Sequence, residues 1–346
     1  MGRRARRHPA LPDPALPDRA GLKQPATPIP TAPPLSLVRL TQDFPVLAGA
    51  LQGAERAALS EAPVLLLGEP GSGRSTVARA FHAASRRAAG ALVEVDVASL
   101  PSSLFESEIF GYRAGAFTGA DRAVEGRVAR AEGGTLVLDQ IEELPVAIQG
   151  KLLRLLAERR YAPLGGPEVE ADVRFVATAS EDLPLRVARG AFRQDLFYRL
   201  EVLAFRLPPL RERQADLPAI AAYLLADLGE RFGRPGLTLA PAALAWFRDY
   251  SWPGNLRELR NVLERSLVML GAGPHGPHQP LPPLAPVPPP GAVGAGESRP
   301  RPLLEVEKEE IRRALAYARG NQRQAAELLG ISRKALWEKR KRYGIP

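Results

Sequence analysis

Residues 62–80 of the 346-residue chain read APVLLLGEPGSGRSTVARA. An apolar run of strand length leads into a glycine-rich segment, GEPGSGRS (68–75), which a helical pattern follows. Glycines let successive backbone N–H groups curl around phosphate oxygens, and the start of the following helix adds a favourable dipole. The order strand, loop, helix therefore predicts a nucleotide-binding site. A plain glycine turn between strand and helix is the alternative.

The loop has the form G-x-x-x-x-G-K-[ST], except that Arg74 stands at the lysine position. Lysine is a compact charge, whereas arginine is planar and forked, so the exchange is not conservative at a tight site. Ser75 is predicted to place its hydroxyl on Mg²⁺. ATP and Mg²⁺ are therefore the expected ligands. The predicted nucleotide-binding residues of the loop are Gly68, Glu69, Gly71, Ser72, Gly73, Arg74 and Ser75.

A second apolar run, GTLVLD, ends at Asp139. Parallel sheets place ligand chemistry at the carboxyl ends of their strands, so Asp139 is predicted to hold Mg²⁺, directly or through water. The alternative is an N-cap for the following helix. Gln140 comes next, where a carboxylate would polarise the attacking water. An amide orients water but cannot take its proton, so Gln140 is a degenerate catalytic residue. Glu142 and Glu143 are candidates to substitute for the missing base, but on a following helix they are expected to face solvent.

Strand-like and helix-like segments alternate through the first part of the chain. The runs 62–68, 91–97, 134–139 and 173–180 have the pattern of buried parallel strands. Their alternation with helical stretches predicts an α/β fold with a parallel sheet. Beyond about residue 210 the patterns are helical only, which predicts a helical subdomain beside the sheet.

Two low-complexity segments divide the chain. Residues 1–35, rich in Pro, Ala and Arg, are predicted to be a disordered arm. Residues 271–302 are proline-rich and are predicted to be an extended linker. Between them lie an α/β subdomain, 36–209, and a helical lid, 210–270; after them comes a small all-α domain, 303–346.

Composition narrows the class of protein. The sequence has no apolar run of the roughly 18 residues that span a membrane and no secretory signal pattern. It has no cysteine, which excludes disulfides and thiolate metal sites and suits a cytoplasmic protein. The formal charge is +9, which fits a nucleic-acid partner or simple solubility.

The C-terminal segment has the pattern of a DNA-binding domain. NQRQAAELLG is a helical stretch that Gly330 ends, and Ser332 caps a further helix, RKALWEKRKRYG. Two helices joined by a short glycine-bearing turn are the helix-turn-helix arrangement, although a solvated basic helix end is the alternative. Leu336 and Trp337 are expected to pack in the core. The predicted DNA-binding residues are Ser332, Arg333, Lys334, Lys339, Arg340, Lys341 and Arg342.

Further motifs give a family resemblance. GAFTGA (115–120), GGTLVLDQIEELP, AFRQDLFYRL and WPGNLRELRNVLERS occur in order between residues 45 and 270. Together they resemble the AAA+ domain of bacterial enhancer-binding proteins, which activate RNA polymerase carrying sigma-54. The C-terminal segment resembles the Fis-type helix-turn-helix of the same family. The resemblance implies an AAA+ P-loop domain with a helical lid.

The resemblance also implies roles for individual residues. The loop Gly115, Ala116, Phe117, Thr118, Gly119 and Ala120 would contact sigma-54, chiefly through Phe117 and Thr118. The alternative is a plain turn with Phe117 tucked inward. Arg193 and Arg199 would reach a neighbour's nucleotide, and Arg257 would sense the γ-phosphate; surface ion pairing is the alternative for the first two. These positions imply a ring, expected to be a hexamer. The resemblance to Fis-type domains implies that the C-terminal domains are dimers on enhancer DNA.

Three departures bear on hydrolysis. The family usually has Lys at Arg74, Glu at Gln140 and Asn at Ser180, a strand-end position that would couple to the nucleotide. Two hypotheses follow: an ATP-driven transcription activator, or an ATP-binding regulator that hydrolyses slowly or not at all. A third, an AAA+ remodeller acting on DNA itself, is disfavoured by GAFTGA. Since only a short arm precedes the AAA+ segment, we expect control by a partner protein, control by expression level, or no control.

Overall fold

The structure, a computed structural model, describes residues 35–269, 280–281, 307–308, 311, 314–315, 318, 321–329 and 331–343. Apart from Leu35 and residues 280–281, the predicted arm and linker lie outside the described residues. The chain divides into two compact units, Met1–Pro286 and Val287–Pro346, which are described separately. Within the described residues, no helix is long and apolar enough to cross a bilayer.

A five-stranded parallel sheet forms the centre of the first unit, in the order β2-β5-β8-β1-β9. Its strands are β1 (Val64–Leu67), β2 (Leu92–Asp96), β5 (Thr135–Asp139), β8 (Arg174–Ala179) and β9 (Leu203–Arg206). The four predicted strands and the α/β class are confirmed. The edge strand β9 was not predicted, because its four residues LAFR are too few to stand out beside the helical stretch that precedes them.

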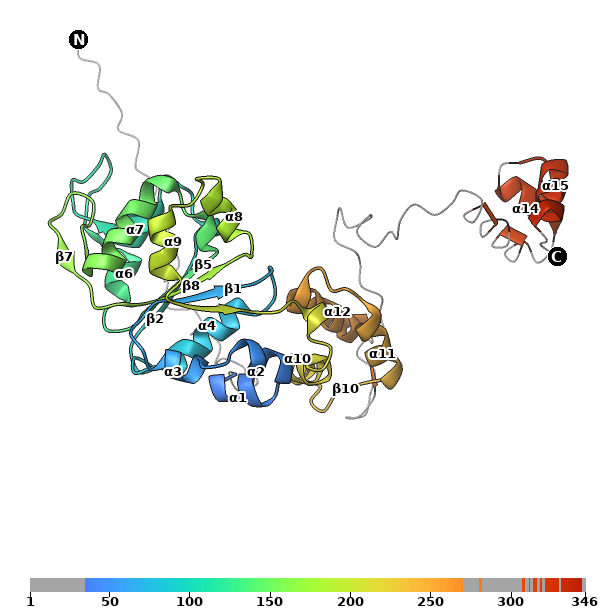
Figure 1. Cartoon of the computed structure of the whole chain (residues 1–346), viewed down its shortest axis with the longest axis horizontal. Helices are drawn as coiled ribbons and strands as arrows, with labels where there is room; N and C mark the ends of the chain where they lie inside the picture. Colours follow the sequence, from blue (N-terminus) through green and yellow to red (C-terminus); the bar gives the residue numbers. More distant parts are fainter. Residues whose placement is uncertain are drawn as a thin grey trace, which may run out of the picture. The chain divides into compact units, whose positions relative to one another are not determined.

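The sheet separates two hydrophobic cores, because alternate residues of a strand point to opposite faces. Val64 and Leu66 belong to one core, and Leu65 and Leu67 to the other. In Figure 1 helices lie on both sides of the strands. The first core is covered by α1 (Leu37–Gln42), α2 (Pro45–Ala50), α3 (Ala54–Ala58) and α4 (Arg74–Ala83). The second is covered by α5 (Phe105–Phe110), α6 (Arg127–Arg130), α7 (Val146–Glu158), α8 (Leu183–Ala188) and α9 (Gln194–Leu200).

The lid consists of α10 (Leu217–Arg231), α11 (Pro241–Asp249) and α12 (Asn255–Met269) and shares the first core. Short strand pairs complete the unit: β3 (Gly111–Tyr112) with β4 (Val124–Glu125), β6 (Arg160–Tyr161) with β7 (Val169–Glu170), and β10 (Thr238–Leu239) with β11 (Pro280–Leu281). The 3₁₀ turns are η1 (Val97–Ser99), η2 (Ile141–Glu143) and η3 (Leu210–Glu212).

In the second unit, α14 (Gln322–Leu328) and α15 (Arg333–Tyr343) pack on a small core. The buried side chains of that core are Ile311, Ala314, Ala318, Ala325, Ala326 and Leu336. The Ser332 hydroxyl accepts the Ala335 N–H at 3.1 Å, so the predicted N-cap of α15 is confirmed. Trp337, expected in the core, is 55% exposed. That expectation is wrong because Leu336, its neighbour, occupies the inward position of α15.

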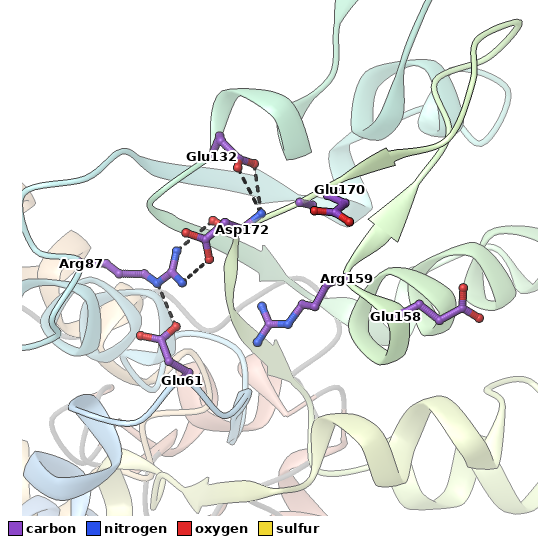
Figure 2. Close-up of a pocket in the computed structure, with 8 residues that line it drawn as sticks. Glu61, Arg87, Glu132, Glu158, Arg159, Glu170 and Asp172 are labelled. Atoms are coloured by element: carbon purple, nitrogen blue, oxygen red, sulfur yellow. Dashed lines mark hydrogen bonds and ion pairs between the residues drawn. The ribbon is translucent and has the colours of Figure 1, made fainter.

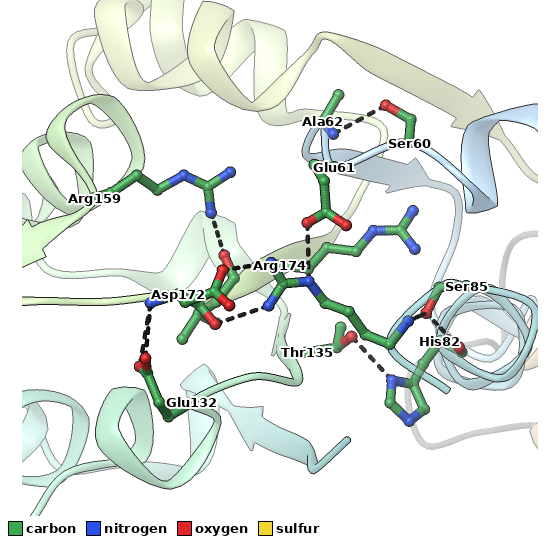
Figure 3. Close-up of polar contacts among 12 residues, drawn as sticks. Ser60, Glu61, Ala62, His82, Ser85, Glu132, Thr135, Arg159, Asp172 and Arg174 are labelled. Atoms are coloured by element: carbon green, nitrogen blue, oxygen red, sulfur yellow. Dashed lines mark hydrogen bonds and ion pairs between the residues drawn. The ribbon is translucent and has the colours of Figure 1, made fainter. Parts of the chain in front are cut away.

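Buried polar groups lie near the amino-terminal ends of the strands. The Arg174 guanidinium donates to the carbonyl oxygens of Ala58 and Ala57 at 2.6 and 2.9 Å. Beside it, His82 Nδ1 and the Thr135 hydroxyl are 2.9 Å apart, and both side chains are buried (Figure 3). Burial, and secondly the Arg174 charge, lower the pKa of His82, which favours a neutral imidazole.

The His82 site predicts a pH dependence of stability. An unfolded histidine has a pKa of about 6.5, so below that pH the unfolded state takes up a proton that folded His82 resists. The free energy of unfolding should therefore fall as pH decreases from about 6.5 to the lowered pKa of His82. His82→Gln should reduce this fall. Urea unfolding of both proteins at pH about 7.5 and 5.5 measures it; identical pH dependence would contradict the assignment.

Candidate nucleotide-binding site

A cleft of about 710 Å³ opens at the carboxyl ends of the strands, between the glycine loop and the lid. It is lined by eight of the predicted site residues: Gly71, Ser72, Gly73, Arg74, Ser75, Asp139, Gln140 and Arg257. Gly68, Glu69 and Ser180 lie beside it and are not part of its lining. The sequence-predicted loop, the end of β5 and the start of α12 are thus brought together.

The glycine loop requires its glycines. Gly71 and Gly73 have φ values of +80° and +104°, which favour glycine. A Cβ on Gly71 would lie 2.5 Å from the Gly254 oxygen. The lid touches the loop at this point, since Leu256 N–H donates to Gly71 O at 3.0 Å. A larger residue at position 71 would therefore separate the lid from the loop.

Asp139 and Ser75 meet at the floor of the cleft. The Ser75 hydroxyl donates to Asp139 Oδ2 at 3.1 Å, and the buried Thr178 hydroxyl donates to Oδ1. Asp139 is not the N-cap of the next turn, because Gln140 holds that position with φ +60°. A hydroxyl and a carboxylate are oxygen donors of the kind that Mg²⁺ uses beside phosphates and waters. Thr178 had no sequence signal, as it lies inside a buried strand.

Gln140 lies at the edge of the cleft and is held at both ends. Its N–H donates to the Thr178 hydroxyl at 3.2 Å, and its side-chain Nε2 donates to Asp96 Oδ1 at 2.9 Å. Its amide is therefore directed by β2 and β8, the strands that flank β5. It presents no group that accepts a proton from water at neutral pH.

Arg74 folds back over its own loop. Its Nη1 donates to the Gly68 carbonyl oxygen at 2.9 Å, and the side chain is buried. Burial lowers the pKa of the guanidinium, and the charges of Glu142 and Asp139 oppose that shift. Arginine remains charged at any neutral pH, so Arg74 supplies a positive charge from the back of the loop.

Glu142 departs from its expected place in solvent, since it is 7% exposed. Its Oε1 accepts the Ser180 N–H at 2.9 Å, which ties η2 to the end of β8. Its Oε2 is buried and has no hydrogen-bond partner within the described residues. Glu143 is exposed as expected and pairs with Arg186 at 2.8 Å. The Ser180 hydroxyl donates to Asp182 and thereby lowers the pKa of that carboxyl.

Several side chains that the sequence analysis did not identify connect the lid to the glycine loop. Arg211 donates to both oxygens of Glu69, at 2.9 and 2.7 Å, and these bonds are the main cause of the lowered pKa of Glu69. Asn255 Nδ2 donates to Glu69 Oε2 at 3.1 Å, and its Oδ1 accepts Leu210 N–H at 2.7 Å. Arg211 and Asn255 lie 142 and 186 positions from Glu69 along the chain, so no local pattern indicates these contacts.

Arg193 and Arg199 lie at the start and near the end of α9, across the sheet from α4. Neither lines the cleft of its own chain. Both ends of the Arg193 guanidinium donate to Asp195, at 3.0 and 2.7 Å, and its N–H donates to Gln149 Oε1 at 2.7 Å. Arg199 donates to the Leu156 carbonyl oxygen at 3.3 Å. Both arginines are exposed.

The GAFTGA loop is closed at its base and open at its tip. Gly115 N–H donates to Ala120 O at 2.8 Å, and the loop glycines have φ values of +80° and +95° with open space around them. Phe117 lies 4.9 Å from the Tyr112 ring, centroid to centroid, yet 46% of it is exposed. Its ring is thus neither tucked into the core nor free of the protein.

A second, charged pocket lies at the amino-terminal ends of the strands, opposite the cleft (Figure 2). There Arg87 pairs with Glu61 at 2.9 Å and with Asp172, and Asp172 N–H donates to Glu132 at 3.2 Å. Glu61, Arg87, Asp172 and Glu132 precede strands β1, β2, β8 and β5. They therefore lie at the amino ends of the strands, whereas parallel sheets place ligand chemistry at the carboxyl ends. The interactions link neighbouring connections and stabilise the sheet edge.

Of the predicted DNA-binding residues, Arg333, Lys334, Lys341 and Arg342 are exposed on α15. Lys339 and Arg340 are partly buried, and Lys339 pairs with Glu307 of the preceding helical segment. The Tyr343 hydroxyl bonds the other oxygen of Glu307. One side of α15 is therefore fastened to its own domain, and the other side remains outward.

A parallel α/β sheet with a glycine loop at its carboxyl edge, a helical lid over that loop and a helix-turn-helix domain define an AAA+ transcription regulator. Residues 40–206 match the Sigma-54 interaction domain, 211–276 the AAA+ ATPase lid domain, and 302–343 the Fis family of bacterial regulatory proteins. The chain belongs to the sigma-54-dependent transcriptional regulators.

Individual relatives support this assignment. Regulatory protein AtoC of Escherichia coli (strain K12) is 42% identical over 87% of this chain and 67% of its own length. Transcriptional regulatory protein ZraR of Klebsiella oxytoca is 41% identical over 89% and 70%. Two crystal structures of NtrX from Brucella abortus, one in complex with ATP, align with TM-scores of 0.65 and 0.61. Both are 31% identical to this chain, and each alignment covers 86% of this chain and 68% of the NtrX chain.

Proposed function

We propose that this regulator binds Mg²⁺–ATP in the cleft, assembles into a ring with that nucleotide, and presents Phe117 to sigma-54. The observation that carries the proposal is the 3.1 Å contact between the Ser75 hydroxyl and Asp139 at the floor of the cleft. These two oxygen donors would hold Mg²⁺, which supplies neutralisation of phosphate charge when bound. The existence of an ATP complex of NtrX, the 31% identical structural relative, also supports this proposal.

Assembly is inferred from the arginines of α9. Arg193 and Arg199 are exposed and lie away from their own cleft, so they reach a nucleotide only in a neighbouring subunit. Asp195 holds the Arg193 fork in one orientation. In a closed ring, expected to be a hexamer, the arginines of each chain would contact the nucleotide of one neighbour, and its own nucleotide would be contacted by the arginines of the other. Arg257, which lines the cleft from the lid, would couple the γ-phosphate to lid position.

The second candidate is a regulator that binds ATP and scarcely hydrolyses it. Gln140 favours this candidate, because its amide cannot act as a general base and is bonded to Asp96. Arg74 adds to it, since the Nη1 bond to Gly68 directs the guanidinium along its own loop. In either case α15 would bind enhancer DNA through its outward cations, and the C-terminal domains of two chains would share one DNA site.

An assembly experiment tests the proposal. The full chain is sized with and without Mg²⁺ and a non-hydrolysable ATP analogue, and immobilised sigma-54 then captures it. We expect a larger particle with the analogue, and a Phe117→Ala variant that assembles but loses sigma-54 capture by about 30-fold, as for an exposed aromatic anchor worth about 2 kcal/mol. Phe232→Ala removes another exposed phenylalanine, 40% exposed, and should capture normally. A particle size that ignores the analogue, or capture unchanged by Phe117→Ala, would refute the corresponding step.

A further inference from the structure

The outward side of α15 carries an aromatic residue among its cations. Arg333, Trp337 and Lys341 are spaced four residues apart, so they form one stripe along the helix, and all three are exposed. Trp337 is 55% exposed, and it does not belong to the core that the described residues of this domain form. Tryptophan is enriched at binding interfaces, where a partner covers its large apolar body, so its position within a basic stripe suggests a contact surface.

The helix cannot easily turn this ring inward. Glu307 bonds both Lys339 and Tyr343, and Leu336 fills the inward position. These contacts fix which side of α15 faces the domain. On the outward side the Lys341 ammonium lies 5.3 Å from the centre of the Trp337 ring, a cation–π distance that restrains the indole. Trp337 is thus a pre-positioned apolar surface flanked by positive charge.

The flanking charge identifies the partner as a polyanion, and the indole requires that this partner have an apolar group. In the DNA major groove, the apolar group that distinguishes one base pair from another is the C5-methyl of thymine. We propose that Trp337 is a sequence-reading residue that packs against thymine methyl groups in the major groove, while Arg333 and Lys341 bind the flanking backbone. This inference rests on the proposed DNA binding by α15. Glu338 shares the outward side and would oppose close phosphate approach at its own position.

A methyl-deletion experiment tests the contact directly. The full chain selects duplexes from a randomised pool, and the selected duplex is then made with deoxyuridine in place of each thymine, which removes only the methyl group. Wild type should lose affinity about fourfold at a contacted position, the value of one buried methyl group. Trp337→Ala should bind the thymine and uracil duplexes equally. Trp337→Phe should retain part of the discrimination, because it keeps an aromatic surface.

Arg342→Ala, which removes an exposed cation from the last turn of the same helix, is the matched control. It should weaken binding to both duplexes alike and leave the thymine-to-uracil ratio unchanged, since a phosphate contact does not depend on the base. Undiminished discrimination in Trp337→Ala would overturn the proposal, as would a wild type that ignores the methyl groups. Failure to enrich any duplex would instead contradict DNA binding by α15 itself, so the two failures are distinguishable.

Fluorescence gives a readout that does not depend on affinity. The chain has three tryptophans, of which Trp252 is buried and Trp246 is partly buried in the lid. The difference in emission between wild type and Trp337→Phe therefore reports the exposed ring. Acrylamide should quench this emission freely in the unbound protein and several-fold less with the selected duplex. Equal quenching in both states would place the ring outside the interface and refute the contact.

Discussion

The Gln140→Glu variant is expected to hydrolyse ATP at least about 100-fold faster than wild type, within the range that general bases contribute. Position 140 follows the strand end at Asp139, lines the cleft, and is held at its backbone by Thr178. The carboxylate would thus stand where it can take a proton from the attacking water. Steady-state release of phosphate, measured at saturating Mg²⁺–ATP, gives the rates.

The neighbouring carboxylate of Asp96 determines which control variants this experiment needs. Gln140 Nε2 donates to Asp96 in the wild type, so a glutamate at position 140 faces a like charge and the two carboxylates repel each other. Asp96→Asn combined with Gln140→Glu removes the repulsion and should keep the gain. Glu143→Gln changes an exposed carboxylate of the same turn and should leave the rate unaltered. A fast wild type that Gln140→Glu does not accelerate would establish that the departures are tolerated.

The Asp216→Ala variant is expected to lose about 3–5 kcal/mol of stability, the cost of leaving a buried charge unpaired. Asp216 is fully buried and accepts Arg213 Nε at 2.9 Å. It also accepts the N–H groups of Val46 and Leu47, at 2.9 and 3.1 Å, at the start of α2. Burial lowers the pKa of Arg213, which depends on Asp216 as its counter-charge. The substitution therefore leaves three donors without their acceptor.

Chemical unfolding with urea measures this loss as a shift of the midpoint. Asp43→Ala is the matched control, because it breaks an exposed Arg–Asp pair with Arg39 in the same region. Exposed pairs contribute at most about 1 kcal/mol, so the control should shift the midpoint little. Equal shifts in the two variants would mean that Asp216 does not join the lid to the sheet domain as its contacts indicate.

Much of the fold was predictable because local patterns carried it. The central strands are continuous apolar runs that a parallel sheet buries on both faces, and GEPGSGRS specifies its own turn through glycine. The edge strand β9 escaped prediction because it has only four residues and follows α9 after a gap of two. Trp337 was misplaced because helical periodicity alone does not distinguish two adjacent apolar residues, Leu336 and Trp337, as the inward one.

The amino-acid sequence by itself determined the class of this protein: the α/β fold, the glycine loop, Asp139 at a strand end, and the departures at Arg74 and Gln140. Only the tertiary structure decided what those departures touch. Gln140 bonds Asp96 from another strand, Glu142 is drawn inward to Ser180, and Glu69 fastens the lid through Arg211. The physical reason is range: backbone turns and burial periodicity depend on neighbours in sequence, whereas hydrogen bonds and ion pairs depend on distances that exist only once the sheet has brought distant strand ends together.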